Sequence, residues 1–356
     1  MNHREVATVR QVKGTSSAYL GCLTVLAALL SAQAVAGETN GGTYDPQACG
    51  DTDDLSLHGC CCSDYFSSDC CDPLWTATAD ALFLTRSKPA PRGVLYDSAT
   101  DAEVFNFSDF DFDYQTGQRL RLLRRVGATS ALSIEYFGIE NLDAHASFGP
   151  GNYDFIAEAD GGPNVTSMDL GYETELHNVE VSLWGGMDRR FSLFGGFRWL
   201  RLDDDFRIAG IQSPSDGNAP FTGVYSGDNN LYGLQVGSNG MLLEMGRLHL
   251  DGFAKAGIYY NDVDTRFLAQ STSFGQFLAE DATGQTAFIG ELGLNLTFNV
   301  TSHIALRGGY QVLWLSGIAT APGQLASTSA NAGTTTVNAT DSMFLHGANA
   351  GLELTW

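Results

Sequence analysis

The sequence predicts an all-β protein, a closed antiparallel transmembrane β-barrel of about ten strands. Three observations predict this fold: strands long enough to cross a membrane, connections that alternate between short and long, and charges kept to one face of each strand. After residue 36, no stretch of 18 consecutive apolar residues occurs. The pattern typical of a transmembrane helix is therefore missing from that part of the sequence.

The first 36 residues have the pattern of a secretory signal peptide. Arg4, Arg10 and Lys13 precede an apolar run, and the small-residue sequence "AQAVAGE" follows it. The run covers about 13 residues, fewer than the ~20 that a membrane-spanning helix needs. We expect cleavage after Ala36 and export to the outer membrane of a double-membraned bacterium.

Residues 37–74 are expected to form a cysteine-rich N-terminal segment outside the barrel. Clustered cysteines in even number favour disulfides in an exported chain. Their spacing lacks the C-x₂-C pairs of zinc sites, and no metal or cofactor is expected. The disulfide candidates are Cys49, Cys60, Cys61, Cys62, Cys70 and Cys71.

The charge balance excludes one class of partner. The chain has a formal net charge of −22. Removal of residues 1–36 would take away three basic residues and one acidic residue, which makes the charge more negative still. Nucleic-acid binding needs a basic surface, so no nucleic-acid partner is expected.

From Trp75 onward, polar and apolar residues alternate in ten segments. Most segments have 10–14 residues, whereas strands of globular proteins average about 5–6 and a tilted membrane strand needs about 9–11. A twelve-strand barrel is the alternative, if the region around 102–114 hides further strands. The ten predicted strands are 75–85, 117–126, 130–139, 172–184, 191–203, 229–240, 247–260, 287–298, 302–315 and 343–356.

The connections between these segments alternate strictly in length. Short links join strands two to three, four to five, six to seven and eight to nine. This is the arrangement of outer-membrane barrels, with short periplasmic turns and long outer loops. It puts the first residue of the first strand and the last residue of the last strand on the periplasmic side. The expected outer loops are 86–116, 140–171, 204–228, 261–286 and 316–342.

Charged residues in mid-strand fall on the face opposite the apolar one, which predicts a charged lumen and an apolar exterior. Residues that pair across a turn have a constant index sum. Turns centred on Ala128, Arg189 and Asn299 would each place opposite charges side by side, which would offset the cost of burying them. The expected lumen pairs are Arg121 with Glu135, Glu180 with Arg198, and Glu291 with Arg307.

The chain ends on "NAGLELTW", an alternating strand closed by an aromatic residue. We expect this strand to pair with the first strand, because a barrel in lipid leaves no open edge. A terminal aromatic strand is also similar to the signal that the outer-membrane assembly machinery reads. The expected partners are therefore that machinery and outer-membrane lipid. Aromatic residues near strand ends predict interfacial girdles: Trp75, Tyr136, Trp184, Phe191, Trp199, Tyr259, Trp314 and Trp356.

Acidic residues cluster in two of the expected outer loops. One group resembles the start of a calcium loop, but Tyr114 replaces the turn glycine and Leu120 replaces the final glutamate. The negative field would enrich cations at a pore mouth. The alternatives are simple solvation, or divalent cations that bridge the loops to lipid headgroups. The pore-mouth candidates are Asp109, Asp111, Asp113, Asp203, Asp204 and Asp205.

Several stretches resemble the outer-membrane β-barrel porins of porin family seven. The most specific are "GFAKAGIYYND" (252–262), "LRGGYQVLWLSGIATAPGQ" (306–324) and "HGANAGLELTW" (346–356). Matching stretches such as "GGFRWLRLDDDF" (195–206) extend over nearly all of 75–356. The resemblance implies a barrel fold, an outer-membrane location and porin activity, and it carries over no catalytic or binding residue.

Strand number limits the function, since about eight strands leave a filled interior and 16–18 leave an aqueous channel. Ten strands favour a narrow channel with a cation-preferring mouth. The alternative is a structural or adhesive barrel that binds partners through its loops and cysteine-rich segment. No enzymatic activity is expected: His145 and Ser147 could form a base–nucleophile pair, but the sequence shows no third group to orient them.

Overall fold

The computed structural model describes residues 73–155, 164–187, 190–273, 275–329 and 334–356. The signal peptide and all six disulfide candidates lie outside the described residues, so these calls stay predictions. None of the helices in the described ranges is both long and apolar enough to cross a membrane.

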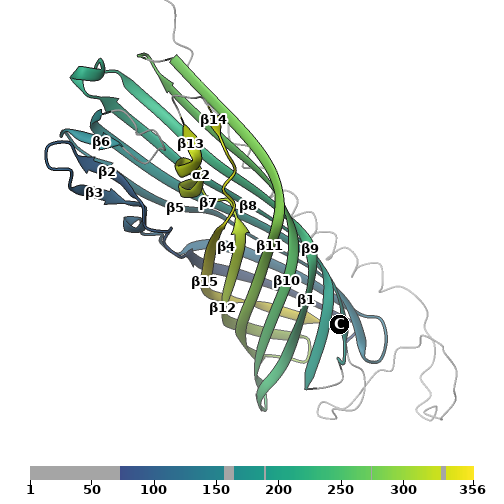
Figure 1. Cartoon of the computed structure of the whole chain (residues 1–356). Coiled ribbons are helices and arrows are strands. Elements are labelled where there is room, and N and C mark those ends of the chain that lie inside the picture. Colours follow the sequence, from purple (N-terminus) through teal and green to yellow (C-terminus); the bar gives the residue numbers. More distant parts are fainter. Residues whose placement is uncertain (1–72, 156–163, 188–189, 274, 330–333) are drawn as a thin grey trace, which may run out of the picture. The chain divides into compact units, whose positions relative to one another are not determined.

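Ten long antiparallel strands form the body of the protein (Figure 1). Backbone pairing runs from β1 through β15, β12, β11, β10, β9, β8, β7, β5 and β4 back to β1, which closes a ring. Each strand therefore has a partner on both edges, as a barrel in lipid requires. The ring strands are β1 Trp75–Arg86, β4 Gln115–Arg125, β5 Ser130–Phe148, β7 Asn164–Gly185, β8 Phe191–Gln212, β9 Pro220–Met245, β10 Leu248–Ser271, β11 Gly275–Asn299, β12 Ile304–Ile318 and β15 Asp341–Thr355.

All ten predicted strands are confirmed, and the twelve-strand alternative is wrong. The region 102–114 holds only the short strand β3, which pairs with β2 and stays outside the ring. The short elements all lie in connections at one end of the barrel: β2 Gly93–Asp97, β3 Glu103–Asn106, η1 Phe107–Asp109, β6 Tyr153–Phe155, η2 Pro214–Asp216, α2 Ala321–Ser327, β13 Thr328–Ser329 and β14 Thr334–Thr335.

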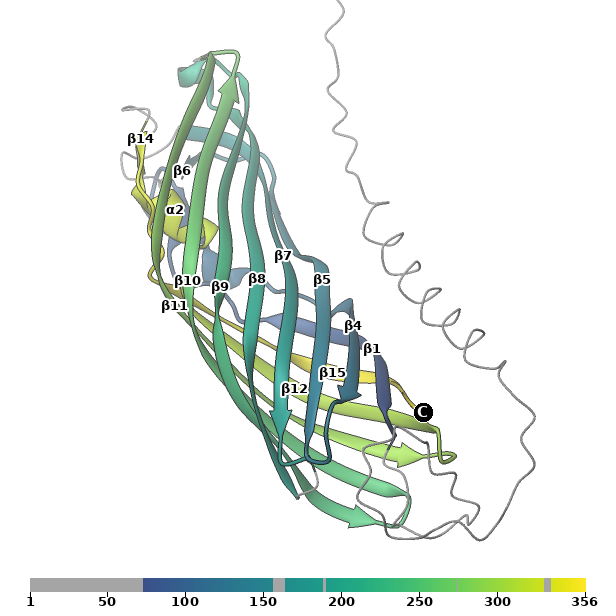
Figure 2. The same ribbon diagram turned by 90° about the vertical axis from the view of Figure 1, so that its right-hand side faces the viewer.

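Three of the five expected outer loops are largely strand, which corrects the prediction. β8 and β9 pair as far as Ile211 and Pro220, and β10 and β11 pair as far as Ser271 and Gly275. β5 and β7 likewise pair well into 140–171. Figure 2 shows β5 and β7–β11 rising well above β1, β4, β12 and β15.

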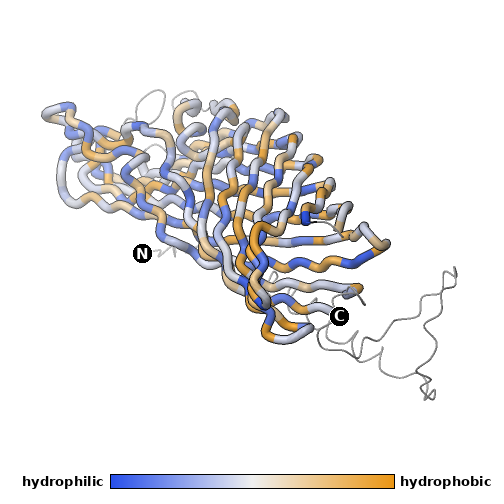
Figure 3. Tube along the Cα trace, turned by 90° about the horizontal axis from the view of Figure 1, so that it is seen from below, coloured by the Kyte–Doolittle hydropathy of each residue, from blue (hydrophilic) through white to orange (hydrophobic). Residues whose placement is uncertain are grey.

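The outward face carries the apolar residues, as predicted. Leu234 and Ile258 expose 72% and 68% of their surface, whereas Glu180 and Arg198 expose 4% and 1%. A soluble barrel would have the opposite arrangement. The alternation of hydrophobic and hydrophilic residues along the strands is visible in Figure 3. The exterior is therefore the face that contacts lipid.

The apolar belt ends part-way up the strands. On β10, outward residues are apolar or aromatic up to Tyr260 and then become Asp262 and Asp264, both exposed. The residues from Leu248 to Tyr260, at about 3.3 Å each and a tilt of about 45°, cover roughly 28 Å of height. This height fits a bilayer core. The upper parts of β5 and β7–β11 therefore form a wall outside the membrane, called the extracellular wall below.

The last residue is held by the first strand. Trp356 donates its backbone N–H to the Trp75 carbonyl at 3.0 Å and accepts from the Trp75 N–H at 2.8 Å. The two indole rings stack with centroids 6.4 Å apart. These contacts close the ring at the short-turn end, where both strand termini lie, and they confirm the expected pairing.

Candidate functional site

A network of six charged side chains crosses the lumen within the membrane-spanning region. Three cations, Arg119, Arg198 and Lys255, meet three carboxylates, so the formal charges balance. The N–O distances are 3.1 Å and 3.5 Å from Arg198 to Glu291 and Glu180, 3.1 Å, 3.4 Å and 3.6 Å from Lys255 to Glu180, Glu135 and Glu291, and 3.6 Å and 3.7 Å from Arg119 to Glu135 and Glu291. We call these six residues the central network.

Neutral side chains add hydrogen bonds to the central network, although Arg119 Nε, one terminal nitrogen of Arg198 and Glu291 Oε1 have no hydrogen-bond partner among the described residues. Asn178 accepts from Arg198 Nε at 2.5 Å and donates to Glu180 at 3.1 Å. Gln235 donates to Glu180 at 2.6 Å, and Gln311 accepts from Arg119 at 2.5 Å. Burial of charge is tolerated only when each ion is paired and hydrogen-bonded. The network therefore fixes the strands around it and fills this level of the lumen.

An apolar layer lies in the lumen above the central network. Its 17 side chains come from nine of the ten ring strands, and none exposes more than 2% of its surface. A water-filled path would leave exposed surface on these residues. Leu84, Leu200, Leu315 and Ile318 are typical members, with at most 1% exposed. We call this group the leucine layer.

Residues 319–329 of the last long connection are fixed inside the barrel above the leucine layer. Asp204, fully buried, accepts from Arg86 at 2.6 Å, from the Tyr172 hydroxyl at 2.6 Å, and from the backbone N–H of Ala321 at 2.9 Å. Asn229 forms two further hydrogen bonds with the Ala319 backbone, at 2.7 Å and 2.8 Å. These contacts hold the start of α2, which Figure 1 shows among the upper parts of the strands.

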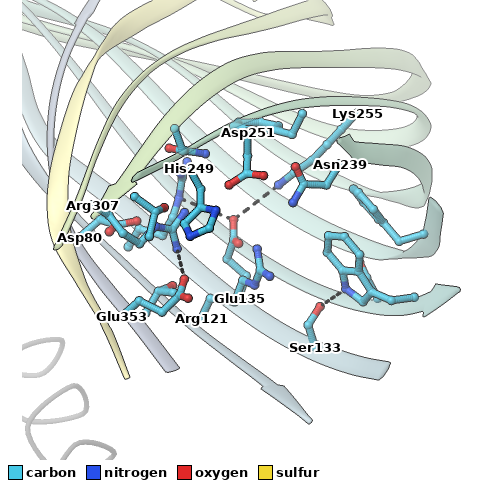
Figure 4. Close-up of a pocket in the computed structure, with 18 of the residues that line it drawn as sticks. Asp80, Arg121, Ser133, Glu135, Asn239, His249, Asp251, Lys255, Arg307 and Glu353 are labelled. Atoms are coloured by element: carbon cyan, nitrogen blue, oxygen red, sulfur yellow. Dashed lines mark hydrogen bonds and ion pairs between the residues drawn. The ribbon is translucent and has the colours of Figure 1, made fainter. Parts of the chain in front are cut away.

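Below the central network, toward the short-turn end, a cavity of about 260 Å³ opens within the barrel. All ten ring strands contribute residues to its lining. Figure 4 shows its charged lining, with Asp251, His249 and Lys255 on one side and Arg121, Glu135 and Glu353 on the other. Short turns face the periplasm in barrels of this kind, so we call this cavity the periplasmic vestibule.

Two of the three predicted lumen pairs have the expected register. Arg121 lies opposite Glu135, and Glu180 lies opposite Arg198. Within the first pair, however, the carboxylate of Glu135 contacts Arg119 and Lys255, with no ion pair to Arg121.

The third pair is wrong. Glu291 lies opposite Leu313, and Arg307 lies opposite Thr297 and pairs with Glu353 at 3.3 Å. The error came from the turn centre. Asn299 continues β11 and hydrogen-bonds His249 at 2.9 Å inside the barrel, and the turn is formed by Thr301–His303, where Thr301 Oγ1 accepts from the Ile304 N–H.

The pore-mouth candidates do not line a mouth together. Asp204 is buried as described above, whereas Asp203 and Asp205 belong to the outward face of β8 and pair with Arg201 and Arg207 at 2.9 Å and 3.0 Å. Strict alternation along the strand separates neighbours in sequence onto opposite faces. The expectation that all three share one mouth is therefore wrong.

The other three candidates lie in the first connection. Asp109 accepts from the Asn106 N–H at 2.9 Å in the capping box of η1, and Asp111 pairs with Lys88 at 2.8 Å on the surface. Asp113 is exposed. The aromatic residues between them point inward instead: Phe107 and Phe110 pack against Tyr172 and Phe206. No group of three or more His, Cys, Asp or Glu that could hold a metal occurs among the described residues.

Two of the expected girdle residues face the lumen instead. Trp184 and Tyr259 point into the lumen with 7% and 2% exposed, so they are not part of an interfacial girdle.

The base–nucleophile pair considered above is not formed. Asp143 contacts His145 at 3.0 Å, but no hydrogen bond joins His145 to Ser147 in the described residues.

Sequence reasoning missed Arg119 as a member of the central network, and it noticed Lys255 only as a charge on the inner face. Face alternation was the available signal, since Arg119 and Arg121 share one face of β4. The side chains that hydrogen-bond to the network, Asn178, Gln235 and Gln311, are neutral and give no comparable signal. Their roles depend on which strands lie across the lumen from one another.

The sequence matches a protein-family model described as "Putative beta barrel porin-7 (BBP7)" over residues 152–356. The chain belongs to this family. It is a porin-like outer-membrane barrel, in agreement with the closed ring and apolar exterior described above. No curated protein matches the chain.

Three solved structures illustrate the similarity of fold. The outer membrane protease OmpT from Escherichia coli aligns at 11% identity with a TM-score of 0.44, covering 79% of this chain and 96% of that one. The translocator domain of the autotransporter NalP from Neisseria meningitidis gives 11% identity and 0.38, covering 79% and 88%. The toluene transporter TodX from P. putida gives 8% and 0.30, covering 79% and 89%. These values carry no conclusion about activity.

Proposed function

We propose that this barrel is closed at rest and acts as a structural outer-membrane barrel that displays its extracellular wall, rather than as an open diffusion pore. The observation that carries the proposal is the leucine layer. A continuous level of side chains with at most 2% exposed leaves no water path through the described part of the lumen. An ion that entered this layer would lose its hydration without replacement partners.

The levels above and below the leucine layer support the same proposal. Below it, the central network occupies the lumen with paired charges. Above it, the contacts of Asp204 and Asn229 hold Ala319 and the start of α2 in place. Of the three levels, the leucine layer offers an ion no polar partner, so it is the main barrier, and a mobile loop alone would not open a path.

The wall supplies surface for partners outside the membrane. Its outward residues on β8 and β10 are largely charged, including Arg201, Asp203, Asp262 and Asp264, whereas most of its inward residues are apolar and packed. This charged exterior is suited to polar partners and to divalent cations that bridge to lipid headgroups. Export by a signal peptide, assembly through the C-terminal strand and the absence of an enzymatic reaction belong to the same proposal.

A narrow channel with a cation-preferring mouth is the second candidate, favoured by membership in a porin family. The geometry of the acidic residues favours it less, because Asp203 and Asp205 face away from the lumen. In this candidate, displacement of the leucine layer would open the path.

Liposome swelling tests the proposal. Vesicles that contain the purified, folded barrel should swell no faster in isosmotic arabinose than vesicles without protein. The double variant Leu200→Ala, Leu315→Ala thins the leucine layer, and once its folding is verified by heat-modifiable gel migration it should swell faster. Rapid swelling with the unchanged protein would overturn the closed state.

A further inference from the structure

The periplasmic vestibule contains an arginine, Arg121, with no carboxylate oxygen within 4.0 Å among the described residues, although Glu135 and Glu353 lie close enough to act on its charge. Arg119, Arg198, Lys255 and Arg307 each have a carboxylate oxygen within 4.0 Å. Arg121, by contrast, forms no ion pair or hydrogen bond with any described residue, and its Nε is buried without an acceptor. Arg121 is half-buried, and a buried N–H without an acceptor is costly, so a ligand that supplies acceptors would be stabilised here.

Arg121 is held in a fixed orientation. Its guanidinium carbon lies 5.1 Å from the centroid of the Trp184 ring. Trp184 is itself positioned by a 2.8 Å hydrogen bond from its indole N–H to the Ser133 hydroxyl. A planar guanidinium that stacks on a fixed ring is suited to receive a carboxylate with two parallel hydrogen bonds.

The opposite wall of the vestibule contains a carboxylate, Asp251, with no cation within 4.0 Å among the described residues, although His249 and Arg307 lie close enough to act on its charge. Asp251 also lines the cavity and has no ion pair or hydrogen bond to a described residue. Figure 4 shows that the contact of the neighbouring Lys255 runs to Glu135 instead. β4 and β10 are five strands apart in either direction around the ring, so Arg121 and Asp251 lie on opposite walls.

Asp80 is the other lining carboxylate without a cation within 4.0 Å. It is 5% exposed, and its Oδ1 has no donor. It lies on β1, directly beside the strand of Arg121, where its backbone pairs with that of Arg119. Asp251 is therefore the carboxylate placed to meet the far end of a molecule that Arg121 holds.

We propose that the periplasmic vestibule binds a small zwitterion, an amino acid or short peptide, with its carboxylate on Arg121 and its ammonium group on Asp251. A ligand with one charge would satisfy one wall and leave the other unpaired. The cavity of about 260 Å³ is slightly below the range of drug-sized pockets, which fits a metabolite of this size. The inference does not depend on whether the lumen conducts, because the vestibule lies on one side of the leucine layer.

Glycylglycine is the probe for this site, with sodium acetate and ethylammonium chloride as the single-charge comparisons. Trp184 lies against Arg121, so its fluorescence reports binding, and titration calorimetry gives an independent measurement. We expect glycylglycine to bind the folded, detergent-solubilised protein saturably, and at least tenfold more tightly than acetate or ethylammonium. Charge-assisted hydrogen bonds contribute about 1.5–3 kcal/mol each, which corresponds to about tenfold or more.

Arg121→Gln and Asp251→Asn should each weaken glycylglycine binding by about tenfold or more. The matched controls are Arg124→Gln and Asp262→Asn, which change exposed residues of the same two strands. The controls should bind as the unchanged protein does. If Arg121→Gln fails the heat-modifiability check, Arg121→Lys keeps the charge but loses the planar fork, and should still weaken binding.

Three results would overturn the inference. Acetate or ethylammonium could bind as tightly as glycylglycine, which would indicate a site for a single charge. Glycylglycine could fail to bind at 10 mM or so, or its binding could be unaffected by both vestibule variants. Each of these is decided without any transport measurement.

Discussion

Replacement of Arg198 by alanine should strongly destabilise the barrel. Arg198 exposes 1% of its surface and contacts two buried carboxylates, Glu291 at 3.1 Å and Glu180 at 3.5 Å. Removing one partner of a buried ion pair costs about 3–5 kcal/mol, because the remaining charge stays buried. The net loss of stability depends on which cations and hydrogen-bond donors still contact each carboxylate in the variant.

Both carboxylates keep another cation in the variant. Glu180 retains Lys255 at 3.1 Å and Gln235 at 2.6 Å, and Glu291 retains Lys255 at 3.6 Å. We therefore expect the lower end of the range, about 3 kcal/mol, which is about 100-fold in the unfolding equilibrium. Adding Glu291→Gln to Arg198→Ala should recover part of this loss, since the two remaining cations would then face two carboxylates instead of three.

Urea unfolding of the lipid-reconstituted barrel, followed by tryptophan fluorescence, measures this free energy. The matched control is Arg201→Ala on the same strand. Its side chain is 46% exposed and pairs with Asp203 at 2.9 Å. An exposed pair contributes about 0–1 kcal/mol, so the control should change little. If the two variants lose the same small amount, the central network is not the stabilising element inferred here.

Three further predictions address other parts of the lumen and wall. A double-mutant cycle between Glu291 and Arg307 should give coupling near zero, whereas the cycle between Glu291 and Arg198 should not; a large Glu291–Arg307 value would restore the pairing rejected above. Asp204→Asn should speed amide hydrogen exchange in α2 by roughly 30-fold, from a loss of about 2 kcal/mol, while Asp205→Asn should leave exchange unchanged; equal exchange in both would exclude the anchoring role. Burial and the neighbouring carboxylates Asp203 and Asp205 raise the pKa of Asp228 to about 6 from a usual 3.8, so stability should fall as the pH rises from about 4 to about 6, where only the unfolded state has lost the proton. Asp228→Asn should remove that part of the fall in urea titrations at several pH values, and an identical slope in both proteins would contradict it.

The membrane-spanning part of the fold could be predicted from sequence because one rule covers it. Apolar residues such as Leu292 and Leu294 face lipid while Glu291 faces the lumen, and this alternation marks both the strands and their faces. The closing pair of Trp75 and Trp356 follows from the same rule, since no edge stays open.

The extracellular wall could not be predicted in the same way because the alternation inverts there. Phe206 and Phe267 point inward with at most 2% exposed, and Arg207 and Arg266 point outward. When strands are predicted from apolar residues on the outward face, segments with this inverted pattern are predicted as loops. Polar sequences such as "DDDF" strengthened that error.

The central network was only partly predictable, because pairing across a short turn reveals neighbours on adjacent strands and nothing farther away. Arg121–Glu135 and Glu180–Arg198 are such neighbours. Contacts across the lumen, such as Arg198 with Glu291, depend on the diameter and stagger of the closed ring. Those quantities are not encoded in any local pattern.

Planar-bilayer conductance of the purified, folded protein tests most directly the claim that the lumen is closed. In symmetric salt, the account predicts no steady current above that of the bare bilayer, and a measurable current only after the leucine layer is thinned by Leu200→Ala and Leu315→Ala. Reproducible discrete conductance steps from the unchanged protein would contradict the closed lumen, and a reversal potential that favours cations in a salt gradient would support the narrow channel in its place.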